Sequence, residues 1–161
     1  MKKHRKQDNK KRGFSLIELL IVVAIILIIA AIAIPNLLRS RIAANEASAV
    51  GALRTLNTAE ITYNTTYPAV GFACTLGALA SSSSPSSTAA GLIDNNLASG
   101  TKSGYSFTMS SCNGTPKSSY QVVAAPVSSS SGQRYFCTDT SAIIQYSAST
   151  IATCGTSTTP I

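Results

Sequence analysis

The sequence predicts an α+β fold: one long amino-terminal α-helix, its first half transmembrane, whose second half packs on a small antiparallel β-sheet. Three observations support this prediction. From Phe14 to Ile34 the only polar side chains are Ser15 and Glu18. After Pro35, apolar residues recur at helical spacing. Beyond about residue 100, short alternating segments are separated by Ser, Gly and Pro, which is typical of an antiparallel meander.

Basic residues are concentrated in the leader, residues 1–13. Seven of the thirteen Lys and Arg residues lie there against one of the six acids, Asp8, so the leader is strongly positive and the remainder nearly neutral. The leader is too highly charged to pack and is expected to be removed. By the positive-inside rule it holds the amino end in the cytoplasm and directs the rest across the membrane. The nearly neutral remainder indicates no nucleic-acid binding.

Residues 14–35 are expected to span the membrane, because a helix of about 22 residues reaches about 33 Å, the thickness of a hydrocarbon core. Glu18 is the exception within this span. An ionisable group in a spanning helix costs about 2.5 to 3.5 kcal/mol and normally has a partner, yet no basic residue follows before Arg39. Cleavage after Gly13 would turn Phe14 into a free α-amine four residues from Glu18, on one helical face of the same or a neighbouring chain.

Gly13-Phe14-Ser15-Leu16-Ile17-Glu18 after a Lys/Arg leader, with Pro35 further along, resembles the signal of type IV pilins and type II secretion pseudopilins. The resemblance covers Lys2 to about Tyr67 well and the remainder in outline. It implies cleavage between Gly13 and Phe14 by a prepilin peptidase, N-methylation of Phe14, and assembly of a filament through the helix. An inner-membrane assembly platform would be a further partner. In that family Glu18 would register each subunit by pairing with the amine of Phe14.

The same helix is expected to continue as an amphipathic half through residues 36–66. Pro35 removes one backbone donor and is expected to kink the helix, and Pro68 ends it near Thr66. The apolar residues that recur at helical spacing are Leu38, Ile42, Ala49, Leu53, Leu56 and Tyr63. The polar residues assigned to the other positions are Arg39, Arg41, Asn45, Glu46, Arg54 and Glu60.

Residues 67–161 are expected to form an exported globular domain. It begins with a Ser-rich connection over residues 67–102, the αβ-loop, with one helical turn near Leu92–Leu97. Strands are expected over Tyr105–Met109, Ser119–Pro126, Arg134–Thr138 and Ala142–Tyr146. Their apolar face would rest on Leu53 and Leu56 of the helix.

All four cysteines, Cys74, Cys112, Cys137 and Cys154, follow the helix, and none has C-x-x-C spacing. An even number of cysteines in an exported domain indicates two disulfides. Three pairings are possible. Modest loop lengths favour Cys74 with Cys112 and Cys137 with Cys154, and the second pair also resembles the carboxy-terminal disulfide loop of many type IV pilins.

The residues of common catalytic and metal sites are missing from the sequence. The single histidine, His4, lies in the leader, which excludes histidine-dependent nucleophiles and zinc sites from a processed chain. P-loop, dinucleotide-binding and EF-hand spacings are also absent. The acids that build a calcium site in some pseudopilins are not evident either. We therefore expect no enzyme, no cofactor and no metal.

The favoured interpretation is a structural subunit of a type IV pilus or pseudopilus. It would be a single-pass inner-membrane precursor with its globular domain periplasmic or extracellular, and its use would be adhesion, motility, DNA uptake or protein secretion. The alternative is a soluble exported binding domain, since Leu19–Ala33 is an uncharged h-region and Ala31-Ile32-Ala33 fits a signal peptidase site. That alternative explains neither Glu18 nor the helix after Pro35. A third interpretation, an uncleaved anchored domain, leaves Gly13 and Glu18 unexplained.

Overall fold

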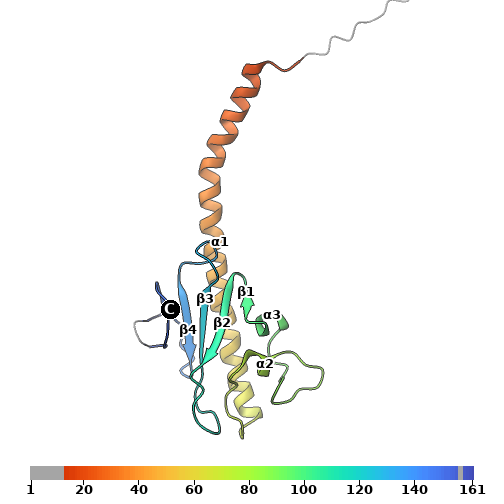
Figure 1. Cartoon of the computed structure of the whole chain (residues 1–161), viewed down its shortest axis with the longest axis vertical. Helices are drawn as coiled ribbons and strands as arrows, with labels where there is room; N and C mark the ends of the chain where they lie inside the picture. Colours follow the sequence, from red (N-terminus) through yellow and green to blue (C-terminus); the bar gives the residue numbers. More distant parts are fainter. Residues whose placement is uncertain (1–12, 156–157) are drawn as a thin grey trace, which may run out of the picture. The chain divides into compact units, whose positions relative to one another are not determined.

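The computed structural model describes residues 13–155 and 158–161 (Figure 1). The expected leader therefore lies outside the described residues except for Gly13. The chain divides into two units, one ending at Leu37 and the other running from Leu38 to Ile161. Helix α1, Leu16–Thr66, has residues in both units. Each unit is described by itself.

The bounds of α1 are close to those expected from the sequence. The helix ends at Thr66, as predicted, and the N–H of Tyr67 closes the last turn by donating to the carbonyl of Tyr63 at 2.8 Å. Pro68 follows and disfavours helical backbone in the residue before it. The helix begins at Leu16 and not at the expected Phe14, because Ser15 acts as its capping residue.

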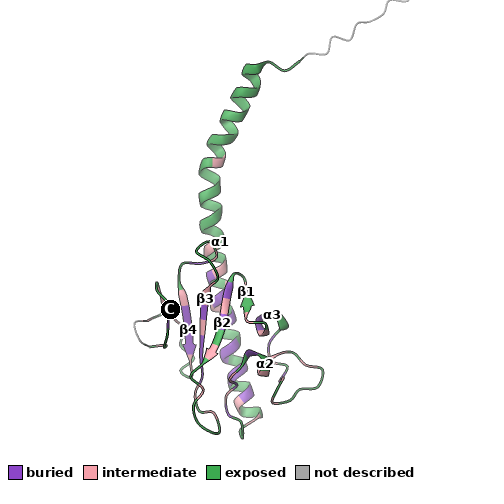
Figure 2. Ribbon diagram, in the orientation of Figure 1, coloured by how far each residue is buried: buried purple, intermediate pink, exposed green. Residues whose placement is uncertain are grey.

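The part of α1 in the first unit is apolar on all sides. Figure 2 shows it almost entirely exposed, and its most apolar stretch has a mean hydropathy of 3.3 with none of it buried. By length and composition α1 is a helix that can cross a membrane.

The second unit contains a six-stranded antiparallel sheet, and its strands are neighbours in chain order. This is the expected meander with two additional edge strands, the first and the last. The strands are β1 Thr101–Lys102, β2 Tyr105–Ser110, β3 Gln121–Pro126, β4 Tyr135–Asp139, β5 Gln145–Ser147 and β6 Thr159–Pro160.

Turn geometry explains two of the strand boundaries. Ser103 and Gly104 join β1 to β2 with φ values of 50° and 75°, the positive pair of a two-residue hairpin turn. The strand expected from Ala142 begins only at Gln145. Ala142 has a φ of 58° and its N–H donates to the Asp139 carbonyl at 2.9 Å, so it belongs to the turn after β4.

One face of the sheet packs on α1, as the alternating strand pattern predicted. In Figure 2 buried residues lie along the strands and along the half of α1 beside them. They form a single hydrophobic cluster. Its principal members are Ala49, Leu53, Leu56 and Tyr63 of α1, Tyr105 and Phe107 of β2, Val122 and Ala124 of β3, and Phe136 of β4.

The long connection between α1 and the sheet contains two short helices. Helix α2, Leu76–Leu79, was not expected, and it starts where Thr75 Oγ1 accepts the N–H of Ala78 at 3.2 Å. Helix α3, Asn95–Ala98, falls near the expected turn and is capped by Asp94.

Replacing Leu56 tests the dependence of the domain on this core. Leu56 is 0% exposed, so Leu56→Ala is expected to lower the free energy of unfolding by about 2 to 5 kcal/mol. The control is Ile61→Ala, because Ile61 lies on the same helix but is 55% exposed. Urea unfolding of the full chain in detergent, followed by the circular dichroism of its tyrosines, measures both. Equal losses in the two variants would contradict this assignment of the core.

Candidate processing and assembly segment

Residues 13–15 lead directly into α1, whose first residue is Leu16. The N–H of Ser15 donates to Glu18 Oε2 at 2.9 Å, and the carbonyl of Ser15 accepts from the N–H of Leu19 at 3.2 Å. Ser15 and Glu18 therefore have the spacing and one of the two hydrogen bonds of a capping box. Glu18 satisfies a backbone donor that would otherwise be unpaired at the start of the helix.

This local role of Glu18 was missed in the sequence, although the Ser-x-x-Glu pattern before an apolar run is its signature. The hydrogen bond to Ser15 occupies Oε2. The described residues donate no other hydrogen bond to Glu18, so Oε1 can accept a second donor. The expected pairing with a free amine at Phe14 therefore stays a prediction.

Gly13 is exposed, and a Cβ added to it would meet no atom within 4 Å. Phe14, which follows, is 90% exposed. The fold itself thus imposes no requirement for glycine at position 13. Any such requirement would come from a protein that binds this segment.

The helix after this segment presents an unusually large apolar surface. The large aliphatic side chains from Leu16 to Leu37 are between 46% and 80% exposed. Soluble monomeric proteins rarely expose contiguous apolar surface of this extent. The segment needs lipid or other apolar helices around it.

Pro35 lies inside α1, and the helix continues on both sides of it. Proline has no N–H, so the carbonyl of Ala31 lacks its usual helical donor. The kink expected at this position stays a prediction.

The four cysteines lie in two pairs at disulfide distance. The Cα atoms of Cys74 and Cys112 are 5.8 Å apart, and those of Cys137 and Cys154 are 5.9 Å apart. Both distances are in the range of native disulfides. The first pair joins the connection after α1 to the segment following β2. The second joins β4 to the segment preceding β6.

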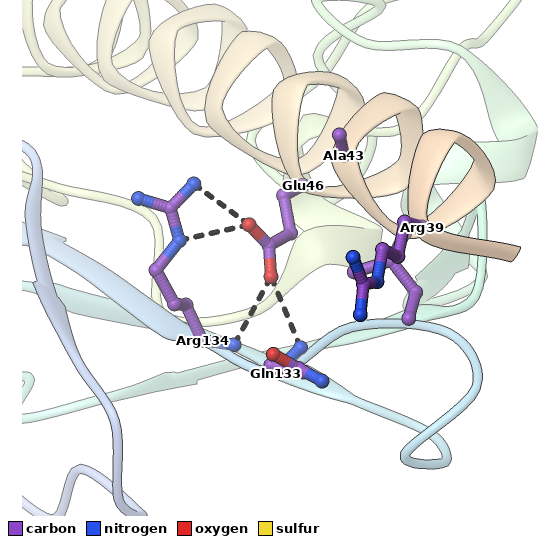
Figure 3. A pocket seen from close by; sticks show the side chains of 6 residues that line it. Arg39, Ala43, Glu46, Gln133 and Arg134 are labelled. Atoms are coloured by element: carbon purple, nitrogen blue, oxygen red, sulfur yellow. Dashed lines mark hydrogen bonds and ion pairs between the residues drawn. The ribbon is translucent and has the colours of Figure 1, made fainter. Parts of the chain in front are cut away.

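Glu46 was assigned to a position outside the apolar face of the helix, and this prediction is wrong. It is 6% exposed and accepts four hydrogen bonds or ion-pair contacts, shown in Figure 3. Oε1 accepts the N–H of Gln133 at 3.0 Å and of Arg134 at 3.2 Å; Oε2 contacts Arg134 Nε at 2.8 Å and Nη2 at 2.7 Å. Burial alone would raise the pKa of Glu46, but these contacts outweigh it and hold the pKa below 4.5.

A hollow of about 480 Å³ lies beside this pair. Its lining consists of Arg39, Ile42, Ala43, Glu46, Gln133 and Arg134 (Figure 3). Because the carboxylate of Glu46 is already fully bonded, it is not available as a general acid or base. Its role is to attach the connection between β3 and β4 to α1.

Glu60 was also assigned to a position outside the apolar face and is instead fully buried, at 0% exposure. Its Oε2 accepts the N–H of Ala73 at 2.8 Å, and its Oε1 has no hydrogen-bond partner among the described residues. Burial raises the pKa of Glu60 to about 7, although the hydrogen bond from Ala73 acts in the opposite direction.

The spacing of residues along α1 is the feature of the sequence that could have revealed the burial of Glu46 and Glu60. Six of the buried positions of α1 follow one another at intervals of three and four residues. They are Glu46, Ala49, Leu53, Leu56, Glu60 and Tyr63.

Besides Glu46 and Glu60, Asn57 is a buried polar residue of α1 that the sequence did not reveal. Its Oδ1 accepts from Tyr120 Oη at 3.1 Å and from Thr138 Oγ1 at 3.0 Å. Its Nδ2 donates to the Ala142 carbonyl at 3.1 Å. Asn57 thus links the helix to the residue that precedes β3, to β4 and to the turn after β4. Across residues 13–155 and 158–161, no group of three His, Cys, Asp or Glu side chains gathers to form a metal site.

Comparison with known proteins agrees with these features of the amino-terminal segment. Residues 8–34 match the family model described as the prokaryotic N-terminal methylation motif. The chain is also 49% identical over 53 residues to the type IV major pilin protein PilA of Myxococcus xanthus (strain DK1622). This match covers 33% of the chain and 24% of the length of that relative. No solved structure matches the chain significantly.

Replacing Glu46 tests its structural role. Glu46→Ala leaves the N–H groups of Gln133 and Arg134 unpaired and is expected to lower the free energy of unfolding by about 1 to 3 kcal/mol. Glu46→Gln keeps an acceptor for these donors and is expected to lose less. The wild-type contribution should be present above pH 4.5 and disappear as the pH falls through the lowered pKa. Urea unfolding at several pH values measures this, and an unchanged stability of Glu46→Ala at pH 7 would contradict it.

Proposed function

We propose that this type IV pilin-like chain is a filament subunit, cleaved after Gly13, N-methylated at Phe14 and assembled into a pilus or pseudopilus through α1. The observation that supports it most is that the methylation motif coincides with the exposed, apolar first part of α1, in which Glu18 is the only charged residue before Arg39. The likeness to a major pilin over 53 residues supports the same function.

Before assembly, the subunit would be a single-pass precursor in the inner membrane. The positively charged leader favours a cytoplasmic amino end, which places the sheet domain in the periplasm or outside the cell. Two cysteine pairs at disulfide distance fit an oxidising compartment. A prepilin peptidase and an inner-membrane assembly platform would be the partners of this precursor.

In the filament, other copies of α1 would replace lipid around the apolar half of the helix. Apolar packing holds such helices together but does not select one axial position, because similar side chains repeat along the helix. A charged pair in an apolar environment does select a position, since an unpaired ion is costly there. We assign this role to Glu18 and the amine of Phe14.

The two carboxylate oxygens of Glu18 would accept different donors. Oε2 holds the start of its own helix through the N–H of Ser15. Oε1 would accept the amine of Phe14, from the same subunit or from its neighbour. Pro35 would supply a local kink beyond this contact, at the point where the helical hydrogen bond to Ala31 is missing.

The amino terminus of the natural product tests the processing. Mass spectrometry of protein purified from its native envelope is expected to find a chain that starts at N-methylated Phe14. Gly13→Ala should leave the longer precursor in the membrane: the added Cβ meets no atom within 4 Å, so the substitution is expected to act on recognition by the peptidase. A product starting at Ile34 would overturn the proposal and indicate a soluble exported domain.

Two substitutions of Glu18 separate its charge from its hydrogen bond. Glu18→Gln keeps an acceptor for Ser15 and removes the charge, whereas Glu18→Ala removes both. Both variants are expected to insert and fold normally but to assemble poorly, with sheared filaments measured by electron microscopy and subunit quantification. Normal filaments from Glu18→Gln would rule out a charged pair, and normal filaments from Glu18→Ala would rule out any registry contact here.

A further inference from the structure

Glu60 lies where α1 meets the segment that follows it, residues 70–74. Its side chain is 0% exposed, and Ala73, which donates to Oε2 at 2.8 Å, is 1% exposed. A buried carboxylate normally accepts several hydrogen bonds or pairs with a cation. Here the second oxygen, Oε1, is completely covered and has no partner among the described residues.

The neighbouring polar groups do not compensate for this. The hydroxyl of Tyr63 donates to the Ser87 carbonyl at 2.6 Å, and that of Tyr120 donates to Asn57 Oδ1 at 3.1 Å. The ion pairs formed by described residues, Arg134 with Glu46 and Lys102 with Asp94, do not involve Glu60. The titratable groups that interact electrostatically with Glu60 are Tyr63 and Tyr120. Tyr63 in turn interacts with Tyr67, and Tyr120 with Asp139; none of these four groups is cationic.

The segment that Glu60 contacts is also attached on its other side. The N–H of Phe72 donates to the Lys117 carbonyl at 3.0 Å, and the N–H of Lys117 donates to the Val70 carbonyl at 2.7 Å. Next along the chain, Cys74 pairs with Cys112. The hydrogen bond from Ala73 to Glu60 attaches this bridged segment to α1, in addition to the apolar packing of Ala73 in the core.

We propose that Glu60 is a protonation-controlled latch: its neutral carboxyl keeps residues 72–74 closed on α1, and its ionisation favours a locally open form in which water reaches the carboxylate. The proposal depends on contacts within the sheet domain and does not require the chain to form filaments. In an exported domain the pH outside the cytoplasm would set how firmly residues 72–74 are held on α1.

The direction of the effect follows from the burial of the group. Burial raises the pKa of Glu60 from its ordinary value of 4.5 to about 7 in the closed form. In the open form the carboxyl is hydrated and regains the ordinary value. The open form therefore ionises first, so opening becomes more favourable as the pH rises from about 4.5 to about 7 and levels off above that.

Hydrogen–deuterium exchange of the Ala73 amide in the full chain, held in detergent, measures the opening directly. After correction for the intrinsic pH dependence of exchange, opening is expected to increase roughly 10- to 100-fold between pH 5 and pH 8. Glu60→Gln retains an acceptor for Ala73 and cannot ionise, so its opening should not change with pH. Asp94→Asn, which removes an exposed acid of another cluster, should respond as the wild type does.

Opening of the wild type that is constant across this range would overturn the proposal. So would a Glu60→Gln variant that keeps the wild-type pH dependence. Should Glu60→Gln fail to fold, carbon-13 NMR titration of the Glu60 carboxyl in the wild type decides the question. A midpoint near 7 is expected, and a midpoint at or below 4.5 would overturn the latch.

Discussion

The buried stripe of α1 between Glu46 and Tyr63 is the contact on which the sheet domain depends. The strands are short: the longest have six residues, and β1, β5 and β6 have only two or three. Such a sheet is stable only when one face is covered. Leu53 and Leu56, both 0% exposed, supply the centre of that cover.

The same stripe also positions the loops, because three of its residues are polar. Glu46 binds the connection before β4, Asn57 binds β4 and the turn after it, and Glu60 binds the segment that leaves the helix. Each contact is directional, whereas apolar packing is not. The helix therefore determines where the connections lie as well as where the sheet lies.

The two buried acids of the stripe show how strongly the number of donors controls a carboxylate. Glu46 has two backbone donors and the guanidinium of Arg134, and its pKa lies below the ordinary value. Glu60 has one backbone donor and no cation, and its pKa lies near 7. Both are carboxylates on one helix, so the difference comes from their partners. Glu46 therefore stays ionised and bonded near neutral pH, whereas Glu60 is suited to respond to pH.

The apolar first part of α1 follows a different constraint: the part of the chain that the structure describes leaves it exposed, so it needs lipid or other subunits around it. Several features of the chain are local patterns that the sequence determined by itself, without any tertiary contact. They are the motif from Gly13 to Glu18, the apolar run, the end of the helix at Thr66 and the alternation of β2. The tertiary structure alone decided the burial of Glu46 and Glu60, the hub at Asn57 and the late start of β5. The partners of Glu46 lie 87 and 88 residues away and those of Asn57 as far as 85. From the sequence, a charged residue is predicted to be exposed, because burying it is unfavourable unless hydrogen-bond donors pair with it. Here those donors are distant in the sequence, so only the tertiary structure reveals them.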